Sequence, residues 1–371
     1  MTSSESSAKR VGQASLRVPK PPARARIAWI AVLVVLSLAS FAVYGRMPPA
    51  QESEFSGSTM GTTYRVKLAS ALSREDRARV ADAISAVLSL SLSRFSTYEP
   101  TSELSRFNRR AEPGGVPVSK ATLSLVDLAL EVSRASEGAF DPSVGPLVEL
   151  WGFGSRRPTS LPPTQQDIAS ARRKVGHAFL ATDHAGQQLV KRRAQIRCDL
   201  SAIAKGQAID DLGGALTALG YQDFLIEIGG ELLARGKNGG HRTWRVGIES
   251  PDPRTQDVAS VVELTDQAIA TSGSYRNFRL LPQGRVSHLI DPRTGHPVEH
   301  ALVSVSVVHA RAALADAWAT ALHILGEQRG YDLAVQRGLA ARFVSKRDGS
   351  LAVRITPGFP AELAPSSRKG D

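Results

Sequence analysis

The stretch "CDLSAIAKGQAIDDLGGALTALGYQDFLIEIGGELLARG", Cys198 to Gly236, contains two kinds of local structure side by side. Its first half carries aliphatic residues at helical spacing, namely Ile209, Leu212, Leu216 and Leu219. Gly220 ends this pattern, as a glycine after a helix commonly does. The run "DFLIEI" then predicts a strand that closes on two adjacent glycines. A helix that leads directly into a short strand favours a mixed fold.

Segments of the same two kinds lie on both sides of this stretch. Short strands are predicted for "TTYRVKL", "TWRVGIE", "ASVVEL", "AIATSG", "VSHLID" and "LVSVSVV", and a hairpin for "QQLVKRRAQIRCDL". Helices are predicted for "REDRARVADAISAVLSLSLSRF", for Lys120–Ser136 and, as the last helix, for Ala312–Leu325. No fixed repeat period runs through them, which excludes solenoids and propellers. We therefore expect an α+β fold with mixed, largely antiparallel sheets flanked by helices.

A basic leader and an uncharged apolar run precede this domain. Residues 1–26 carry six basic side chains against the single acidic Glu5. Residues 27–44, "IAWIAVLVVLSLASFAVY", would form a helix roughly 27 Å long, close to the thickness of a bilayer's hydrocarbon core. Because no convincing small-x-small site follows, we expect an uncleaved transmembrane anchor, with a cleaved signal peptide as the alternative.

The position of the charges indicates where the chain lies. The positive-inside rule places everything after Arg46 on the outer face of the membrane, which in a bacterium is the periplasm. We expect a single-pass inner-membrane protein with a linker at 45–54, a folded domain at 55–360 and a flexible tail at 361–371. Much of the formal charge of +11 belongs to the leader, and no basic stripe is interleaved with aromatic residues. These features argue against a nucleic-acid partner.

The start of the helix in "CDLSAIAKGQAIDD" is the first candidate site. Asp199 is expected to end a strand and Ser201 to cap the helix. Gly206 in the first turns would let another backbone or a ligand approach closely. Together with Lys205, the free N–H groups of such a helix start favour an anion. On this segment alone, a capped helix with a solvent-facing lysine is the favoured explanation.

A second candidate lies in the last predicted helix. Asp316 and Thr320 are four residues apart, so a helix places both oxygens on one face. A hard cation such as Mg²⁺ takes a carboxylate with neutral oxygens and is often shared with a ligand phosphate. One aspartate and one threonine are too few alone, so a backbone carbonyl and phosphates would have to complete the shell. The alternative is that both side chains only form a polar helix face.

Three further stretches could carry chemistry. The pair Gly229–Gly230 would admit a flat ligand or form a plain turn. The run "AIATSGSYRNF" could hold a phosphate or form an ordinary hairpin. Asp291 before Pro292 favours a turn. His288 could take a proton from a hydroxyl near neutral pH if it faces a pocket, whereas burial against its apolar neighbours would make it a core histidine.

Taken in order, these stretches resemble the ApbE family, the FAD:protein FMN transferases. The resemblance rests on "GSTMGTTYRV", "FSTYEPTSELSRFN", "GAFDPSVGPLVELWGFG", "CDLSAIAKGQAID", "EIGGELLARG", "ATSGSYRNF", "SHLIDPRTGHPV" and "LADAWATALHILG". Eight motifs in one order are far more specific than any one of them, and they cover essentially the whole part of the chain after the anchor.

The resemblance implies a set of site residues. Members of the family bind FAD and Mg²⁺ and move FMN onto a serine or threonine of an acceptor protein, with AMP leaving. The implied FAD site is lined by Met60, Tyr98, Ala139, Phe140, Asp141, Asp199, Lys205 and Ile290. The implied metal ligands are Asp316, Thr320 and the backbone carbonyl of Ala202, and the implied base is His288. This chain has Ala319 where some relatives have a second aspartate, and it lacks the N-terminal cysteine of the lipoprotein members.

Three functions follow from the resemblance and the anchor. The leading one is an anchored flavin transferase whose partner is an exported FMN-binding protein of a redox complex. In the second, water replaces the acceptor hydroxyl, and the chain is an FAD pyrophosphatase that yields FMN and AMP. The third, a non-catalytic flavin carrier, is disfavoured because a carrier would not need the metal site implied by Asp316 and Thr320.

Overall fold

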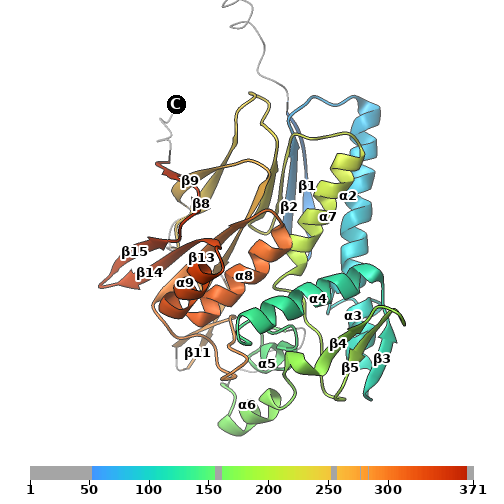
Figure 1. The fold of residues 1–371 in the computed structure, drawn as a ribbon, viewed down its shortest axis with the longest axis vertical. Helices are drawn as coiled ribbons and strands as arrows, with labels where there is room; N and C mark the ends of the chain where they lie inside the picture. Colours follow the sequence, from blue (N-terminus) through green and yellow to red (C-terminus); the bar gives the residue numbers. More distant parts are fainter. Residues whose placement is uncertain (1–51, 155–160, 252–256, 276, 283, 366–371) are drawn as a thin grey trace, which may run out of the picture. The chain divides into compact units, whose positions relative to one another are not determined.

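The computed structural model describes residues 52–154, 161–251, 257–275, 277–282 and 284–365. The chain divides into two units, Met1–Pro49 and Ala50–Asp371, and all described residues belong to the second. At its centre lies an eight-stranded sheet in the order β1-β2-β6-β7-β10-β13-β14-β15, with every pair antiparallel (Figure 1). The bounds are β1 Ser53–Thr59, β2 Thr62–Leu68, β6 Phe224–Ile228, β7 Glu231–Arg235, β10 Gln267–Gly273, β13 Leu302–His309, β14 Ala340–Arg347 and β15 Ser350–Ile355.

Three smaller antiparallel sheets accompany the central one. The first has the order β16-β9-β8 and consists of β8 Trp244–Glu249, β9 Val258–Leu264 and β16 Glu362–Leu363. The second has the order β3-β5-β4 and consists of β3 Gly114–Pro117, β4 Leu180–Asp183 and β5 Gln188–Lys191. The third is the hairpin of β11 Phe278–Leu281 and β12 Gly284–Ser287.

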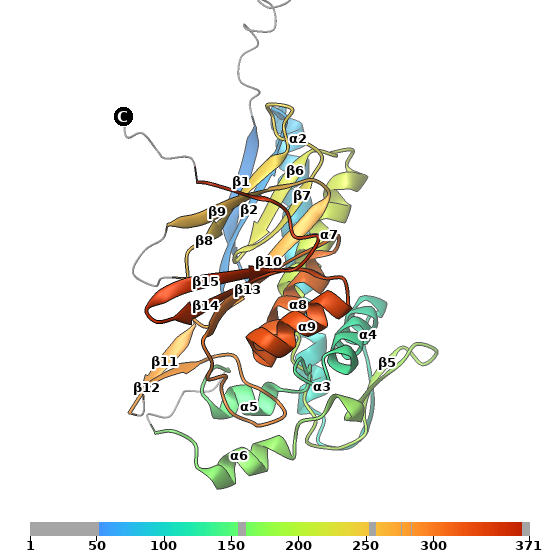
Figure 2. The same ribbon diagram turned by 60° about the vertical axis from the view of Figure 1, so that its left-hand side comes forward.

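Helices cover one face of the central sheet and the small β8 sheet covers the other (Figure 2). The helices on the first face are α2 Arg74–Phe95, α7 Ala204–Ala218, α8 Ala312–Leu325 and α9 Glu327–Gln336. On β7, Leu233 packs with α7 while Leu232 packs with the core beneath β8. This alternation is what a strand with two covered faces requires. The remaining helices are α3 Glu103–Arg109, α4 Lys120–Ala135, α5 Gly145–Leu150, α6 Gln165–Arg172 and the 3₁₀ turn η1 His177–Phe179.

The structure confirms the α+β class and most of the predicted elements. The predicted bounds of α8, Ala312–Leu325, agree with the structure at both ends. The prediction that α8 is the last helix is wrong, because α9 and the β14–β15 hairpin follow it. Gly330 lowers the helix propensity of α9, but it lets α9 pack closely on α8, since a Cβ there would lie 2.6 Å from the carbonyl oxygen of Leu322.

Two local predictions near α7 are wrong. Asp199 does not end a strand, because only Gln188–Lys191 of the predicted hairpin segment forms one, and residues 196–200 are irregular. Ser201 does not cap α7, which begins at Ala204 without a side-chain cap. The N–H of Ser201 is instead bound by the carboxylate of Asp199 at 2.9 Å. A local aspartate turn thus precedes the helix.

Two further predictions need correction at their boundaries. Of "VSHLID", only the first two residues, Val286 and Ser287, lie in a strand, as the end of β12, and Ile290 makes an isolated bridge to Pro297. The predicted tail at 361–371 contains β16, which pairs with β9 and is therefore held on the fold.

The predicted membrane anchor at 27–44 lies outside the described residues. Among the helices that the structure does describe, none combines the length and the apolar character needed to cross a bilayer.

Candidate active site

A lysine shared by two buried carboxylates forms the centre of the candidate site. The ammonium nitrogen of Lys205, in the first turn of α7, lies 3.3 Å from Oε1 of Glu231 and 3.5 Å from Oδ2 of Asp316. Oδ2 of Asp316 also accepts the backbone N–H of Gly206 at 3.2 Å. Both carboxylate residues are 5% exposed. Side chains from α7, β7 and α8 therefore meet at one point between the sheet and its helices.

The charges of this cluster shift one another's pKa values. Burial alone would lower the pKa of Lys205, but the carboxylates of Asp316 and Glu231 outweigh burial and raise it. Burial raises the pKa of Glu231 against the opposing effect of Lys205. Lys205 thus keeps its positive charge, and its side chain remains 26% exposed. It can therefore also meet an anion from solvent.

The contact between α7 and α8 explains why Lys205 and Asp316 meet. A Cβ on Gly206 would lie 2.3 Å from the carbonyl oxygen of Ala312, so only glycine allows the two helices to approach this closely. The carboxylate of Asp210, one turn further along α7, accepts the N–H groups of Ala312 and Ala313 at 2.8 and 3.1 Å. Asp210 thereby caps α8 from a neighbouring helix. The expectation that Gly206 admits another backbone is confirmed.

Glu231 enters the site through the turn at Gly229–Gly230. Both glycines have positive φ, +64° and +105°, and join β6 to β7. Sequence reasoning noticed the glycines but missed Glu231 itself. The alternation of side chains along β7 could have revealed it, because Glu231 lies on the same strand face as the buried Leu233. A charged residue on an apolar strand face is buried only when something pairs with it.

His288 is held in the form that a general base requires. Its Nδ1 lies 2.9 Å from the backbone carbonyl oxygen of Asn277, so Nδ1 carries the proton and Nε2 is left as the acceptor. Burial lowers the pKa of His288, with Lys205 adding to the effect against the Asn277 bond. The ring of Phe153 packs edge-on at 6.2 Å. His288 is therefore neutral at pH 7 and within the electrostatic reach of Lys205.

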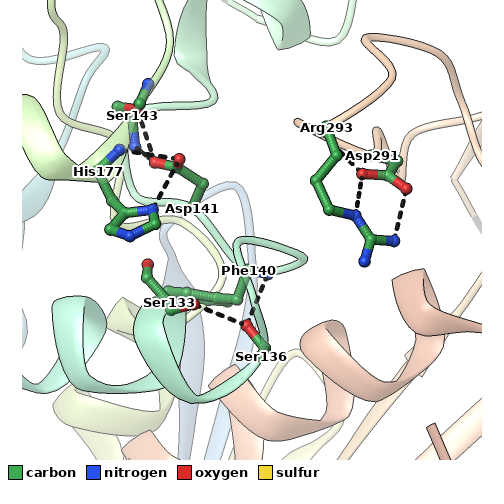
Figure 3. A network of polar contacts seen from close by, with 9 residues as sticks. Ser133, Ser136, Phe140, Asp141, Ser143, His177, Asp291 and Arg293 are labelled. Carbon is green, nitrogen blue, oxygen red and sulfur yellow. Dashed lines mark hydrogen bonds and ion pairs between the residues drawn. The ribbon is translucent and has the colours of Figure 1, made fainter. Parts of the chain in front are cut away.

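Asp141 organises a loop instead of projecting a free carboxylate. Oδ1 accepts the N–H and hydroxyl of Ser143 at 2.7 and 2.6 Å, and Oδ2 accepts the N–H of His177 at 2.9 Å (Figure 3). The hydroxyl of Ser143 in turn accepts the N–H of Gly176 at 2.7 Å. This network ties the loop after α4 to the turn before η1. Asp141 fixes the shape of the predicted FAD-binding loop.

The Asp291–Arg293 pair flanks the same loop. The guanidinium of Arg293 donates to both oxygens of Asp291, at 2.8 and 2.7 Å (Figure 3). A Cβ on Gly138 would lie 3.8 Å from His177 and 4.0 Å from Arg293, so the loop passes between these two side chains. The turn predicted at Asp291 is present, because its carboxylate also accepts the N–H of Arg293 at 2.9 Å.

Tyr98 and Asp199 form a second polar region. Tyr98 is 66% exposed. Its pKa is raised, first by the partial burial of its hydroxyl end and then by the negative charges of Asp199 and Glu149. The N–H of Asp199 donates to the carbonyl of Pro142 at 2.7 Å, which joins this region to the Asp141 loop. An exposed aromatic ring beside a carboxylate can stack on a flat ligand.

Other predicted FAD residues turn their side chains into the protein. Ala139, Phe140 and Ile290 are at most 3% exposed and pack in three different apolar clusters. They can meet a ligand only through their backbone. Met60 lies at the tip of the β1–β2 turn with φ +50° and packs partly against the α2–α7 core. No hydrogen bond joins these residues to the Lys205 cluster within the described ranges.

The predicted metal ligands come from two segments, the helix α8 and the turn that precedes α7. Asp316 is buried on α8, Thr320 lies half-buried one turn later, and Ala202 lies half-buried in the turn before α7. Ala319, where some relatives have a second aspartate, is 1% exposed in the largest core cluster. Within the described residues no three His, Cys, Asp or Glu side chains gather as a metal site. Any cation here depends on neutral oxygens.

A fixed ammonium, two carboxylates and a neutral histidine on an α+β scaffold define a centre suited to transferring a phosphate-bearing group. Comparisons with known proteins agree with this class. The family model described as "ApbE family" matches residues 60–343. The chain is 35% identical to an FAD:protein FMN transferase of Klebsiella pneumoniae (strain 342), over 90% of this chain and 96% of the relative. It is 36% identical to that of Vibrio cholerae, over 91% and 99%.

Solved structures give the same result. "Flavin Transferase ApbE from Vibrio cholerae" matches with a TM-score of 0.77 and 35% identity, covering 84% of this chain and 99% of that chain. The apo form of the Pseudomonas stutzeri flavinyl transferase ApbE matches with a TM-score of 0.74 and 35% identity, covering 83% and 95%. This chain belongs to the ApbE family. Like its relatives, it is a transferase.

Proposed function

We propose that the chain is an FAD:protein FMN transferase, which moves FMN from FAD to a serine or threonine hydroxyl of an exported acceptor protein and releases AMP. The observation that carries the proposal is Lys205, held by two buried carboxylates at the start of α7 with neutral His288 nearby. This arrangement offers a fixed positive charge to a pyrophosphate and a base to a hydroxyl. The names of the relatives support the choice of substrate.

Asp316, Thr320 and the backbone carbonyl of Ala202 would hold Mg²⁺. The donor set fits a hard cation, because it consists of oxygens only. Oδ2 of Asp316 accepts from Lys205 and Gly206, while among the described residues no hydrogen bond reaches Oδ1. When bound, Mg²⁺ would neutralise charge on the bridging phosphates.

The residues of the chain would carry the rest of the reaction. The acceptor oxygen forms a bond to the FMN-side phosphorus, and the bond from that phosphorus to the bridging oxygen breaks, so that AMP leaves with the bridging oxygen. Nε2 of His288 takes the proton of the hydroxyl, since Nδ1 is occupied by the carbonyl of Asn277. Lys205 stabilises the negative charge that develops on the phosphates. The Asp141 network keeps the predicted FAD-binding loop in place.

The proposal is tested with the full chain, FAD, Mg²⁺ and an exported flavoprotein subunit as acceptor. We expect a fluorescent flavin band on a denaturing gel and one AMP per flavin transferred. AMP without the band would favour the pyrophosphatase, and FAD binding without AMP would favour the carrier. Replacing Asp316 with Ala should abolish AMP release, and an unchanged rate would contradict the assigned metal site.

We also propose that residues 27–44 anchor the chain in the inner membrane with the domain in the periplasm. The support is the uncharged apolar run after a leader with six basic residues. Cell fractionation should leave the chain in the membrane after a carbonate wash, and externally added protease should digest the domain in spheroplasts. A chain released by the wash, or protected from the protease, would contradict the anchor or its orientation.

A further inference from the structure

A cavity of about 140 Å³ lies between the central sheet and β8. One wall consists of four consecutive residues, Val246–Glu249, of β8. The opposite wall comes from the Gly229–Gly230 turn and from Thr271 and Gly273 of β10. Tyr275 also lines the cavity, and its hydroxyl lies 3.5 Å from the carboxylate of Glu249.

β8 presents a free edge to this cavity. Within the described residues β8 pairs only with β9, so its other edge has no strand partner. The residues of that strand that line the cavity follow one another without a gap. An unpaired edge of this kind is a template for an added strand. The cavity is therefore shaped for an extended backbone.

The walls favour a main chain with small side chains. Four of the lining residues are glycines, Gly229, Gly230, Gly247 and Gly273, so these stretches of the wall carry no side chains. The oxygen of the one small hydroxyl in the wall, Thr271, already lies 2.8 Å from that of Ser306.

Two short connections link the cavity to the candidate active site. Gly230 lines the cavity, and the next residue, Glu231, holds Lys205. Tyr275 lines the cavity, and the carbonyl of Asn277, two residues later, holds His288. A segment bound along β8 would thus run beside the backbone that positions both the ammonium and the base.

We propose that an extended segment of the acceptor protein adds as a strand to the free edge of β8 and brings its serine or threonine hydroxyl to His288. This inference rests on the proposed function, because it concerns the second substrate of the same reaction. The chemistry is that of the transfer already described: the hydroxyl oxygen bonds to the FMN-side phosphorus, its proton passes to Nε2 of His288, and AMP leaves.

Hydrogen exchange on the full chain tests the inference directly. The probe is a nine-residue peptide of glycine and alanine with one central threonine, and its twin has valine in place of threonine. With FAD and Mg²⁺ present, both peptides should slow exchange of the amides of Val246–Glu249 at least about fivefold, and only the threonine peptide should become flavinylated. Exchange is measured whether or not transfer occurs. No protection of β8 by either peptide, or equal protection by FAD alone, would overturn the inference.

Substitutions in the opposite wall give a second measurement. Thr271→Phe fills the cavity from β10 and should raise the KM for the threonine peptide about tenfold or more, with the Kd for FAD unchanged. Thr271→Val keeps the volume of the side chain and should leave this KM near that of the wild type. An unchanged FAD affinity also shows that both variants are folded. A Thr271→Phe variant with a wild-type KM would contradict the inference.

The proposed function and the β8 site can be disproved separately. If the wild type labels an acceptor and releases AMP while β8 stays unprotected, the proposed function stands and the β8 site is wrong. If the wild type neither labels an acceptor nor releases AMP, the proposed function fails and the inference falls with it.

Discussion

The buried Glu231 is the residue that most needs an explanation. Its Oε1 binds Lys205, but its Oε2 is buried without a hydrogen-bond partner within the described residues. Leaving a buried carboxylate oxygen unsatisfied costs roughly 1–3 kcal/mol. Lys205 faces two carboxyl groups, and burial raises the pKa of Glu231 to about 7, so the cluster gains its net negative charge as the pH rises through this value. Such a cluster has room for an additional cation, which is consistent with the metal proposed at Asp316.

Replacing Glu231 with Gln tests its role in this balance. Glutamine keeps the shape of the side chain but removes its charge. Lys205 would then pair with Asp316 as its remaining carboxylate and would compete there with a bound cation. We expect the Mg²⁺ concentration for half-maximal AMP release to rise about tenfold, a change of about 1.4 kcal/mol. Glu263→Gln on the exposed face of β9 is the control and should leave the titration unchanged. Identical titrations for wild type and Glu231→Gln would refute the coupling.

His288 gives a prediction that separates a base from a packing residue. His288→Ala should lower the rate of AMP release about 10²–10⁴-fold, the usual contribution of a general base. In the wild type the rate should fall only as the pH drops below 6.5, because burial lowers the pKa of His288 and its neutral form persists into weak acid. A pH–rate profile measures this. A wild-type profile that falls already above pH 7, or an active alanine variant, would exclude the role.

At the level of secondary-structure elements, the contact between α7 and α8 sets the geometry of the site. Gly206→Ala places a methyl group against the backbone of Ala312 and should lower the free energy of unfolding by about 1–3 kcal/mol, as overpacking commonly does. Gly214 lies on the same helix with open space around it. Gly214→Ala should therefore raise stability by about 0.5–1 kcal/mol. Urea unfolding measures the free energy of unfolding of both variants. Equal changes in the two variants would mean that α7 and α8 are not tightly packed at Gly206.

Asp210 is expected to stabilise the start of α8 from outside that helix. Asp210→Ala leaves the N–H groups of Ala312 and Ala313 without their partner and should cost about 1–2 kcal/mol, the upper range for a lost helix cap. Among the described residues, the neighbouring Asp211 accepts a hydrogen bond only from the side chain of Gln207, at 2.7 Å. Asp211→Ala is the matched control, with an expected loss within about 0.5 kcal/mol. Thermal unfolding compares the two variants, and similar losses would show that the cap contributes little.

For the molecule as a whole, local periodicity predicted the elements but not their partners. The bounds of α8 could be predicted because its apolar residues recur at helical spacing up to Gly326. The pairing of β7 with β10 could not, because residues between them form β8 and β9 of another sheet. Strand order depends on contacts between distant segments, which a single sequence does not show.

The same limit applies to the site. Lys205 and Asp316 are visible as candidates because charged residues interrupt apolar helices, but their meeting depends on Gly206 and Asp210 fixing α7 against α8. Glu231 was missed because its partner Lys205 lies 26 residues earlier, on another element. The family resemblance supplied the site residues that periodicity could not. Their roles remain predictions for the variants above to test.

The stability of the whole domain should depend on pH through His323. This side chain is fully buried on α8, donates from Nδ1 to the carbonyl of Ser272 at 3.0 Å, and has no partner for Nε2 within the described residues. Burial, opposed only in part by the Ser272 bond, lowers the pKa of His323 to about 3. The unfolded chain binds a proton below about pH 6.5, whereas the folded chain does not until about pH 3. His323 therefore makes unfolding easier as the pH falls through this window.

The expected size follows from the linkage between proton binding and folding. Between pH 7 and pH 5 the free energy of unfolding should fall by about 2 kcal/mol on account of His323. Asn at this position keeps a donor for Ser272 but does not titrate, so His323→Asn should lose that part of the pH dependence even though its stability at pH 7 is lower. Urea unfolding of both proteins at the two pH values gives the difference directly, because the other titrating groups cancel. Parallel losses in both proteins would mean that His323 is accessible to protons in the folded state.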